Sequence, residues 1–371
     1  MKILINASVT GHVVNGLLVY SREMLKELLP RLRAAGHEAT LLIPRGSILE
    51  ELDVEKRYLP AICGTQKKRS PLSPICRLAY NLFVLPFVAR KFDVVYSPTP
   101  HGAFWGRTPQ ILTLHDLIFL QFPGQHRLHA SYLRIFLPRL LRHSKKVVAI
   151  SNVTKQLMAS AFGTPDEKTS VIYNGCSDQF HPVDDAAQTV AAKYGVRDYI
   201  LACGVGFPYK NIRFLVGCYA KLPREVQLRH PLVAIGINTE ASAQSLMHDA
   251  STLPCASEIR FLGMVPSADL AALYSAARVF VFPTLAEGFG MPPIEALRCG
   301  TPSLVSDLPI LRETLAMSDE RYFNPFDEAS LRACLLNELA KEKRVPPKTL
   351  ERVKTFSWSA AAEQLLALLV S

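Results

Sequence analysis

The chain has 371 residues, of which 49% are hydrophobic, and it carries a formal net charge of +10. This length indicates two domains, and so large an apolar fraction supports packed cores and excludes a disordered chain. No run reaches the roughly 20 apolar residues that a transmembrane helix needs, and the apolar run at the N-terminus is too short for a signal peptide, so we expect a cytoplasmic protein.

Strand-like and helix-like patterns alternate along the first half of the chain. A strand is predicted at 2–9, and a helix with apolar residues at helical spacing is predicted at 18–34. Further buried strands are predicted from short apolar runs at 39–43, 93–96, 110–114 and 146–150. Alternation of this kind favours a parallel sheet covered by helices.

A second alternating series follows a polar stretch at 176–198, which we interpret as a linker. Helices are predicted from about residue 211 and, at the end of the chain, from Trp358. The strands of this series are predicted at 199–203, 232–236, 259–263, 279–283 and 301–305. The sequence thus predicts two α/β units, each with a doubly wound parallel sheet. Ligands of such sheets bind beyond the carboxyl ends of the strands, so the loops that follow strands are the candidate sites.

Two of these loops lie in the first half of the chain. One ends at Gly16, whose backbone can approach a phosphate, although any tight turn also uses glycine. The other contains His115 and Asp116, a pair that can orient hydroxyls or move a proton. The alternative for His115 is a histidine that only caps a helix or bonds to a backbone carbonyl.

In the second half, Lys210 lies in a glycine-bearing loop at the expected start of a helix. Its charge adds to the positive end of the helix dipole, and this combination favours a diphosphate. The alternative is a solvated surface lysine, which is the usual environment of this residue type.

The most informative motif joins the strand at 279–283 to the helix that follows it. Glu287 precedes this helix and Glu295 lies in its first turn. Glycines and N–H groups at a helix start form an anion site, and carboxylates accept hydrogen bonds from the hydroxyls of a phosphate ester. Taken singly, Glu287 is also explained as a carboxylate in the first turn of a helix, and Glu295 as a surface residue on a helix. Their coincidence with Gly288 and Gly290 favours a site that holds sugar, diphosphate and ribose together.

The sequence indicates no metal site and no cofactor. It has no Asp-x-Asp, its eight cysteines form no Cys-x-x-Cys pair, and its histidines do not take metal-ligand spacing. The Gly-x-Gly-x-x-Gly turn of NAD enzymes is absent from both units.

The run from Phe282 to Pro302, with the two glutamates at E-x7-E spacing, resembles the signature of glycosyltransferase family 4. This family contains retaining, nucleotide-sugar-dependent glycosyltransferases of the GT-B fold, and the resemblance spans nearly the whole chain. Within the family, the segment 114–123 is similar to bacterial mannosyltransferases of surface-polysaccharide assembly.

The resemblance implies two Rossmann-like domains that face a central cleft. Residues 1–180 would form the N-terminal, acceptor-side domain, and residues 181–356 would form the domain that binds the nucleotide sugar. The C-terminal helix at 357–371 would pack back on the N-terminal domain.

The resemblance also implies roles for single residues. Glu295 would accept from the ribose hydroxyls of the donor, Glu287 would face the transferred sugar, and Lys210 would offset the charge on the leaving diphosphate. Gly16 would approach the same phosphate, and His115 would line the sugar and acceptor side of the cleft. The backbone N–H groups that would hold the distal phosphate are those of Phe289, Gly290 and Met291.

Two positions depart from the family pattern. Family members often carry an arginine near Lys210, where this chain has Val205 and Tyr209. Arg213 is expected to lie one helical turn too far along. The paired glycines of the first loop are replaced by Asn15-Gly16.

The expected activity is that of a retaining, metal-independent hexosyltransferase in cell-surface polysaccharide synthesis. GDP-mannose is the leading donor, and a glycan or a lipid-linked oligosaccharide is the expected acceptor. A UDP- or dTDP-sugar donor, carrying glucose or rhamnose for example, stays open. A GT-B epimerase or a non-catalytic nucleotide-sugar binder fits less well, because such epimerases lack the E-x7-E run and the site residues named above are all present.

The positive charge is concentrated in the first half of the chain. Residues 1–170 carry 23 Lys and Arg against 11 Asp and Glu, whereas residues 171–371 carry 19 against 21. Nucleic acid is not expected as a partner, because no zinc-finger, RNP-type or basic-zipper motif is present. The apolar run with flanking cations at 66–91 favours a polyprenyl-diphosphate-linked acceptor and a peripheral location on the anionic inner face of the membrane. The alternative is an amphipathic helix packed on the sheet with a solvated basic face.

Overall fold

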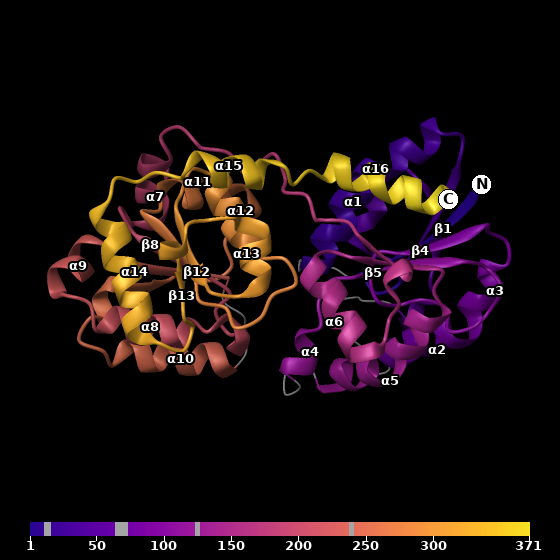
Figure 1. The fold of residues 1–371 in the computed structure, drawn as a ribbon, viewed down its shortest axis with the longest axis horizontal. Coiled ribbons are helices and arrows are strands. Elements are labelled where there is room, and N and C mark those ends of the chain that lie inside the picture. Colours follow the sequence, from indigo (N-terminus) through magenta and orange to yellow (C-terminus); the bar gives the residue numbers. More distant parts are fainter. Residues whose placement is uncertain (11–15, 64–72, 123–126, 237–240) are drawn as a thin grey trace. The chain divides into compact units, whose positions relative to one another are not determined.

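The structure is a computed structural model that describes residues 1–10, 16–63, 73–122, 127–236 and 241–371. It divides into two compact units, an N-terminal unit of Met1–Gly175 with Phe356–Ser371 and a C-terminal unit of Cys176–Thr355. Each unit contains one parallel sheet with helices on both faces (Figure 1). The predicted pair of doubly wound, Rossmann-like units is thereby confirmed. We expected the division after residue 180, and the structure divides the chain after Gly175.

The sheet of the N-terminal unit has seven parallel strands in the order β3-β2-β1-β4-β5-β6-β7. Its central strands are buried on both faces, which explains why they appear in the sequence as continuous apolar runs. The strands are β1 (Lys2–Asn6), β2 (Glu38–Ile43), β3 (Glu55–Tyr58), β4 (Val94–Ser97), β5 (Gln110–Leu114), β6 (Lys146–Ala149) and β7 (Thr169–Val171).

The helices of this unit cover both faces of its sheet, and a π-helical segment, η3 (Tyr80–Val84), joins α2 directly to α3. They are α1 (Gly16–Ala34), α2 (Ser73–Ala79), α3 (Leu85–Ala89), α4 (Ile118–Gln121), α5 (Arg127–His143), α6 (Asn152–Phe162) and α16 (Trp358–Val370). In the described parts of the whole chain, no helix is long and apolar enough to cross a membrane.

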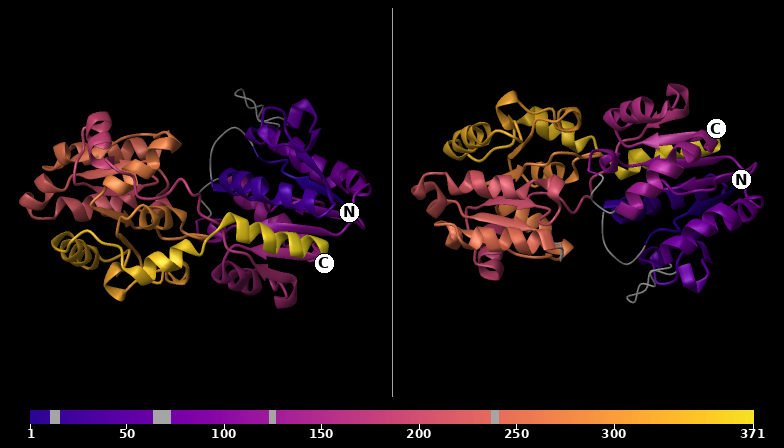
Figure 2. Two further views of the ribbon diagram at one scale, coloured as in Figure 1. Left: turned by 90° about the horizontal axis from the view of Figure 1, so that it is seen from above. Right: turned by 90° about the horizontal axis from the view of Figure 1, so that it is seen from below.

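The C-terminal helix α16 returns to the N-terminal unit, where it packs along α1 (Figures 1 and 2). The Trp358 ring meets Tyr20 of α1 edge-on, with ring centroids 5.5 Å apart. A Cβ on Gly175 would lie 2.1 Å from the Trp358 backbone nitrogen, so only glycine fits at this approach. Gly175, the last residue of the segment Met1–Gly175, therefore lies against Trp358, the first residue of α16.

The sheet of the C-terminal unit has six parallel strands in the order β10-β9-β8-β11-β12-β13. The strands are β8 (Ile200–Cys203), β9 (Leu232–Ile235), β10 (Ile259–Phe261), β11 (Val279–Phe282), β12 (Ser303–Ser306) and β13 (Tyr322–Phe323). The helices are α7 (Ala186–Tyr194), α8 (Ile212–Ala220), α9 (Arg224–Arg229), α10 (Ala241–Ser251), α11 (Ser267–Ala276), α12 (Met291–Arg298), α13 (Pro309–Leu315), α14 (Glu328–Ala340) and α15 (Pro347–Lys354). The expectation that 176–198 is only a linker is wrong, because α7 forms there and packs on α11.

Candidate active site

Two neighbouring strands of the C-terminal sheet lead into the predicted site. β8 and β11 pair in parallel, and Ile200 lies opposite Val279. The strand order reverses between them, because β9 and β10 extend the sheet on one side while β12 and β13 extend it on the other. Ligands of open α/β sheets bind at such a reversal, beyond the carboxyl ends of the strands. The loop after β8 carries Lys210, and the loop after β11 carries Glu287.

The backbone after β8 gives the Lys210 side chain its place. Gly204 has a φ of +94°, and a Cβ on it would lie 2.8 Å from Lys210 Cγ. A short 3₁₀ turn, η5 (Pro208–Lys210), then ends at Asn211, which adopts a left-handed conformation and begins α8. Glycine at position 204 therefore leaves the space that the aliphatic part of Lys210 occupies.

Lys210 and Glu287 form a largely buried ion pair. Lys210 Nζ lies 2.5 Å from Glu287 Oε1, and the two side chains are 13% and 11% exposed. The ammonium group also lies 4.6 Å from the centroid of the Phe282 ring, which is within range of a cation–π interaction. The structure thus brings together two predicted site residues that are 77 positions apart in the sequence.

Hydrogen bonds tie these two loops to each other. The Leu285 N–H donates to Tyr209 O at 2.7 Å. Thr284 Oγ1 lies 3.2 Å from the same carbonyl oxygen, 3.0 Å from Ala286 O and 3.0 Å from Glu287 Oε1, so its single proton serves one of these three acceptors at a time. Thr284 was not predicted as a site residue, although a hydroxyl three residues before a candidate carboxylate is a signal in the sequence that points to it.

Lys210 stays protonated although its side chain is largely buried. Burial lowers the pKa of Lys210, but the carboxylate of Glu287, with smaller effects of Tyr209 and Cys203, raises it, and the net shift is upward. Lys210 is therefore an ammonium ion at neutral pH. A fixed positive charge at a strand-order reversal is what an anionic ligand requires.

Glu295 lies on α12 and accepts a hydrogen bond from the Tyr274 hydroxyl of α11 at 3.0 Å. Burial raises the pKa of Glu295 to about 7, while Tyr274 and Lys210 act to lower it. Burial and the nearby Glu295 also keep the pKa of Tyr274 well above its ordinary value, so the tyrosine is the donor. Glu295 is thus a carboxylate that a further hydrogen-bond donor would stabilise in its ionised form.

The start of α12 carries the backbone N–H groups that the sequence predicted. Gly290 caps the helix with a φ of +86°, a conformation that strains any residue with a side chain. The two residues after Met291 are prolines and have no N–H to offer. Within the described residues, neither the Gly290 nor the Met291 N–H donates to a protein acceptor. Phe289 is buried, and its carbonyl accepts from the Thr314 hydroxyl at 3.2 Å, which holds this turn in place.

His115 follows β5 in the N-terminal unit and is 7% exposed. Its Nε2 lies 2.8 Å from Pro98 O, which can only accept, so Nε2 carries the proton and Nδ1 is left as an acceptor. The Tyr20 ring meets His115 edge-on with centroids 4.5 Å apart. Burial lowers the pKa of His115 to about 4, although the bond to Pro98 opposes this, so the ring is neutral at pH 7. The bond to a backbone carbonyl is the alternative considered above, and a role toward a ligand stays a prediction.

Gly16 is the first residue of α1 and is exposed. The preceding loop residues, 11–15, which include Asn15, lie outside the described residues. Among the described residues, nothing lies within 4 Å of the position that a Cβ on Gly16 would take, so packing against them does not require glycine there. The role of Gly16 toward a phosphate stays a prediction.

The sequence positions near Lys210 at which family members often carry an arginine hold Val205 and Tyr209 in this chain. Arg213 forms an ion pair with Asp249 instead and lies 3.1 Å from Ser245 Oγ. Val205 is fully buried, and the Tyr209 ring centroid lies 5.4 Å from Lys210 Nζ. Among the described residues, no group of three or more His, Cys, Asp or Glu side chains is placed to hold a metal ion.

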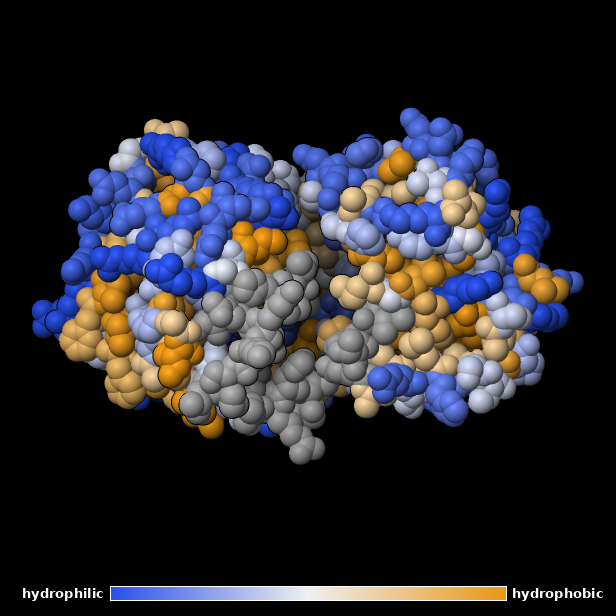
Figure 3. Space-filling view, turned by 180° about the vertical axis from the view of Figure 1, so that it is seen from behind, coloured by the Kyte–Doolittle hydropathy of each residue, from blue (hydrophilic) through white to orange (hydrophobic). Residues whose placement is uncertain are grey.

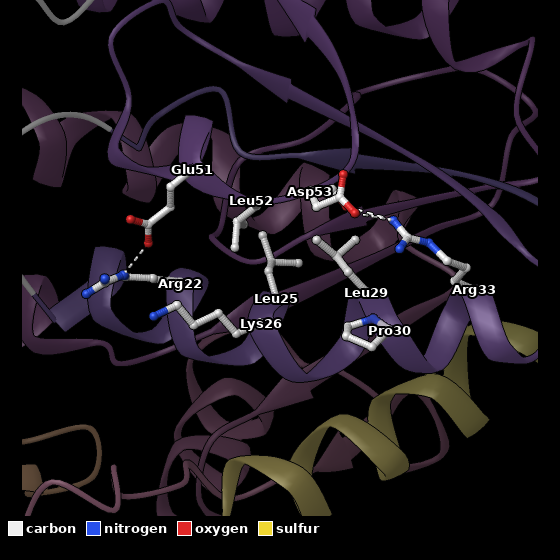
Figure 4. A pocket seen from close by; sticks show the side chains of 9 residues that line it. All are labelled: Arg22, Leu25, Lys26, Leu29, Pro30, Arg33, Glu51, Leu52 and Asp53. Atoms are coloured by element: carbon white, nitrogen blue, oxygen red, sulfur yellow. Dashed lines mark hydrogen bonds and ion pairs between the residues drawn. The ribbon is translucent and has the colours of Figure 1, made fainter.

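A surface pocket of about 390 Å³ lies elsewhere, on the N-terminal unit between α1 and η1 (Ile48–Glu51) (Figure 4). Two ion pairs cross it, Arg22 with Glu51 at 2.7 Å and Arg33 with Asp53 at 3.0 Å. Four of the charged groups of this pocket thus pair with each other, Lys26 pairs with Glu23 outside it at 3.9 Å, and none of the predicted site residues is among the described residues that line it.

Comparison with known proteins assigns both halves of the chain. Residues 23–180 match Glycosyltransferase Family 4, and residues 185–354 match Glycosyl transferases group 1. The O-antigen chain mannosyltransferase RfbU of Salmonella typhimurium is 30% identical over 289 residues, which is 78% of this chain and 77% of that protein. The O-antigen chain mannosyltransferase B of Escherichia coli is 30% identical over 69% of this chain and 68% of its own length. The serotype-specific mannosyltransferase WbdA of Escherichia coli is longer, and the 29% identical match covers 68% of this chain but 32% of WbdA.

Solved structures share the fold over the whole chain. Sucrose-phosphate synthase from Thermosynechococcus elongatus superposes with a TM-score of 0.75 at 20% identity, covering 99% of this chain and 98% of that one. HepE from Anabaena, solved in complex with UDP and glucose, superposes with a TM-score of 0.76 at 18% identity and covers 100% of both chains. These likenesses confirm the GT-B fold. Together with the family matches and the relative of 30% identity, they show that the chain belongs to glycosyltransferase family 4 and is a glycosyltransferase.

Proposed function

We propose that this glycosyltransferase moves mannose from GDP-mannose, with retention of the anomeric configuration, to a glycan or lipid-linked oligosaccharide in cell-surface polysaccharide synthesis. The observation that carries the location of the site is the Lys210–Glu287 ion pair at the strand-order reversal, beside the start of α12. The choice of sugar and acceptor is supported by relatives that are named as mannosyltransferases of O-antigen chains.

The donor diphosphate is held by Lys210 and by the backbone N–H groups of Phe289, Gly290 and Met291. This arrangement is supported by the raised pKa of Lys210 and by the two N–H groups at the start of α12 that have no protein acceptor among the described residues. Glu295 accepts from the ribose hydroxyls. Gly16 and His115 of the N-terminal unit keep the roles predicted for them, toward the phosphate and toward the sugar and acceptor.

Donor binding changes the partner of Lys210. The diphosphate carries more negative charge than one carboxylate, so it competes with Glu287 for the ammonium group. Glu287, once released, accepts hydrogen bonds from hydroxyls of the transferred sugar. The ion pair of the ligand-free site is therefore replaced by two separate contacts to the donor.

In the reaction, the bond between the sugar C1 and the diphosphate oxygen breaks, and C1 bonds to an acceptor hydroxyl oxygen on the same face. The departing phosphate takes the proton of that hydroxyl. Lys210 and the N–H groups of the α12 start stabilise the negative charge that develops on the leaving oxygen. His115 does not supply a proton, since its pKa is about 4; its Nδ1 accepts a hydrogen bond from a hydroxyl instead.

A UDP-sugar is the second candidate donor, and the likeness of the fold to HepE, which was solved with UDP and glucose, favours testing it. No metal and no cofactor take part in the proposed reaction, because Lys210 and the N–H groups supply the positive charge. We also propose that the enzyme works in the cytoplasm at the inner face of the cell membrane, where a polyprenyl-diphosphate-linked acceptor would lie.

A thermal-shift series with GDP, UDP and dTDP identifies the nucleotide, because a ligand that binds the folded state raises its melting temperature. The largest rise is expected with GDP. The protein is then incubated with GDP-mannose, with and without extracted lipid-linked acceptor. Release of GDP that depends on the acceptor supports a transferase. Conversion of the donor without acceptor would indicate an epimerase, and binding without turnover would indicate a non-catalytic binder.

A further inference from the structure

The interior of the N-terminal unit contains a row of three aromatic rings, those of Trp358, Tyr20 and His115, which we call the ring cluster. Tyr20 of α1 meets His115 edge-on with centroids 4.5 Å apart, and it meets Trp358 of α16 edge-on at 5.5 Å. Apolar residues, drawn in orange, reach the surface of this unit on the face at the left of Figure 3, but the ring cluster is covered. Trp358, Tyr20 and His115 are 7%, 2% and 7% exposed. One tyrosine thus joins the returning C-terminal helix to a candidate site residue.

The Tyr20 hydroxyl holds the middle ring of the cluster in place. It lies 3.2 Å from the Tyr96 hydroxyl of β4 and 3.2 Å from Thr113 Oγ1 of β5, and these two partners lie 3.1 Å apart. Burial raises the pKa of both tyrosines, so each hydroxyl keeps its proton. Three hydroxyls at these distances donate in a closed cycle, each to the next, so all three are satisfied. The Tyr20 ring is therefore fixed between α1 and the sheet.

Tyr20 contacts the end of β5 at two positions that share one face of the sheet. Side chains two residues apart along a strand point to the same side, and Thr113 lies two residues before His115, which directly follows β5. The Tyr20 hydroxyl meets Thr113, and the Tyr20 ring meets His115. The tyrosine therefore spans the end of the strand that leads to the candidate histidine.

Two contacts define the direction of the His115 ring. The hydrogen bond from Nε2 to Pro98 O, at 2.8 Å, holds one atom of the imidazole, and the edge-on contact with Tyr20 holds its plane. Together they give Nδ1, which is left as an acceptor, a single direction. Among the described residues, no carboxylate bonds to His115, so these two contacts are what orients it.

We propose that Tyr20, backed by Trp358, is the residue that positions His115 for sugar transfer. It keeps His115 Nδ1 directed at the hydroxyl from which this nitrogen is proposed to accept. The C-terminal helix thereby contributes to the acceptor side of the site through Trp358 and Tyr20. The inference rests on the proposed function, because it needs the role of His115 in transfer. The alternative is a ring cluster that only fills the core of the unit.

The variants are compared by the rate of GDP release from GDP-mannose at limiting extracted lipid-linked acceptor. Tyr20→Leu removes the middle ring, and this rate is expected to fall about two- to tenfold, which corresponds to the loss of one neutral hydrogen bond at His115. Tyr20→Phe keeps the ring and is expected to retain most of the rate, since Tyr96 and Thr113 still bond to each other. Trp358→Leu removes the backing ring and is expected to lower the rate, though less than Tyr20→Leu does.

A cycle of single and double variants separates positioning from packing. His115→Ala is expected to lower the rate at least as much as Tyr20→Leu does. In the His115→Ala background, Tyr20→Leu is expected to have no further effect, because no imidazole is left to position. If the two losses multiply instead, Tyr20 acts through packing alone and the proposal is overturned. Trp358→Leu enters the same cycle and decides the question if Tyr20→Leu does not fold.

The orientation of His115 is also measured without an acceptor, by NMR of the full chain with isotope-labelled histidine. His115→Asn identifies the signals of this ring. The wild type and Tyr20→Phe are expected to show one sharp set of signals, with the proton on Nε2. In Tyr20→Leu these signals are expected to broaden or divide, because the ring takes up several orientations. Signals that stay as sharp in Tyr20→Leu as in the wild type would overturn the proposal.

Tyr219→Leu is the matched control in the C-terminal unit. Tyr219 of α8 is also fully buried, and its hydroxyl lies 3.1 Å from Gln227 O and 3.2 Å from His230 O. This variant is expected to lower the melting temperature, as Tyr20→Leu does, and to keep the transfer rate. An equal loss of rate in both variants would mean that destabilisation is the cause, and would also overturn the proposal.

Two outcomes separate this proposal from the proposed function. A wild-type rate for Tyr20→Leu beside a loss for His115→Ala would overturn the role of Tyr20 alone. A wild-type rate for His115→Ala would remove His115 from the site, and the positioning role with it. In both cases a melting-temperature rise with GDP shows that the donor site stands, whereas no rise with any nucleotide would mean that the proposed function itself fails.

Discussion

The Thr284 hydroxyl lies 3.0 Å from Glu287 Oε1, the same carboxylate oxygen that Lys210 Nζ approaches to 2.5 Å. Thr284 is fully buried, and its Oγ1 also lies 3.2 Å from Tyr209 O in the loop that carries Lys210. One hydroxyl thus contacts both loops that follow the adjacent strands β8 and β11. We therefore regard Thr284 as a positioning residue for the ion pair.

Replacing Thr284 by Val keeps the branched shape and removes the hydroxyl. The kcat is expected to fall roughly tenfold or more, because a hydrogen bond to a charged group contributes about 1.5–3 kcal/mol. The KM for the donor is expected to change little. Thr284→Ser is the matched control, since it keeps the hydroxyl, and it is expected to retain most of the activity. If both variants lost kcat equally, Thr284 would act through packing alone and not through its hydroxyl.

Removing the charge of Lys210 is expected to slow transfer strongly. Lys210→Ala takes away the cation that offsets the charge on the leaving diphosphate, and kcat is expected to fall by about 10²–10³-fold. Lys221→Ala is the control, because Lys221 is an exposed lysine that pairs with Glu328. Acceptor-dependent release of the nucleotide is measured for both variants. A near-normal kcat for Lys210→Ala would remove this residue from the site.

Glu287→Gln is expected to separate donor binding from transfer. The amide no longer competes for Lys210, so GDP is expected to bind at least as tightly as it binds the wild type. Transfer is expected to be crippled, because the contact of a carboxylate with the sugar hydroxyls is lost. Titration calorimetry with GDP and a turnover assay give the two quantities. A fully active variant, or one that binds GDP tenfold more weakly, would contradict this role.

The raised pKa of Glu295 predicts a pH dependence of stability. In the ligand-free protein this pKa is about 7, against an ordinary value of 4.5. Between these values the folded state holds more protons than the unfolded chain, so the free energy of unfolding falls as pH rises through this window. The stabilisation of the folded state by protonated Glu295 is fully present below pH 4.5 and is lost above pH 7. Its upper limit is about 3 kcal/mol.

Glu295→Gln removes the contribution of Glu295 to the pH dependence of the free energy of unfolding. Urea unfolding at pH 5 and pH 8 is expected to show a smaller loss of stability for the variant than for the wild type across this range. The same difference between the two pH values in both proteins would mean that Glu295 is already ionised in the folded state.

Gly290→Ala tests the turn at the start of α12. A side chain at a φ of +86° is strained by about 1–2 kcal/mol, and the new Cβ would also lie 2.5 Å from Leu311 Cδ2. Gly195→Ala is the control, because Gly195 also has a positive φ, at the end of α7, but no described residue lies within 4 Å of its Cβ position. Both variants are expected to melt at lower temperature, and only Gly290→Ala is expected to lose affinity for GDP. Equal GDP affinity in both would mean that the turn does not contact the donor.

The buried parts of both sheets could be predicted from the sequence, because a strand covered on both faces is a continuous apolar run. Three of the four edge strands, β3, β7 and β13, could not, whereas the edge strand β10 was predicted at 259–263. The sequence of β3, Glu55 to Tyr58, contains three charged residues, and β13 has two residues in all. Both exist through their pairing with a neighbouring strand, as Glu55 pairs opposite Thr40, and such pairing is not a local property of the sequence.

For the site, Lys210 and Glu287 could each be predicted because each follows a strand. Their contact could not, since it depends on β8 and β11 being neighbours in the sheet. Tyr274, the hydrogen-bond partner of Glu295, was missed for the same reason, because α11 and α12 meet only in the folded unit. The family and the GT-B fold are confirmed, whereas the sugar, the nucleotide and the retention of configuration remain proposals.

The structure of the protein with GDP bound would show whether the donor diphosphate takes the place of Glu287 beside Lys210. We expect the diphosphate within hydrogen-bond distance of Lys210 Nζ and of the N–H groups of Gly290 and Met291, with the ribose against Glu295. We also expect the ion pair between Lys210 and Glu287 to be open. A diphosphate bound elsewhere, or bound here with that ion pair intact, would contradict this proposal.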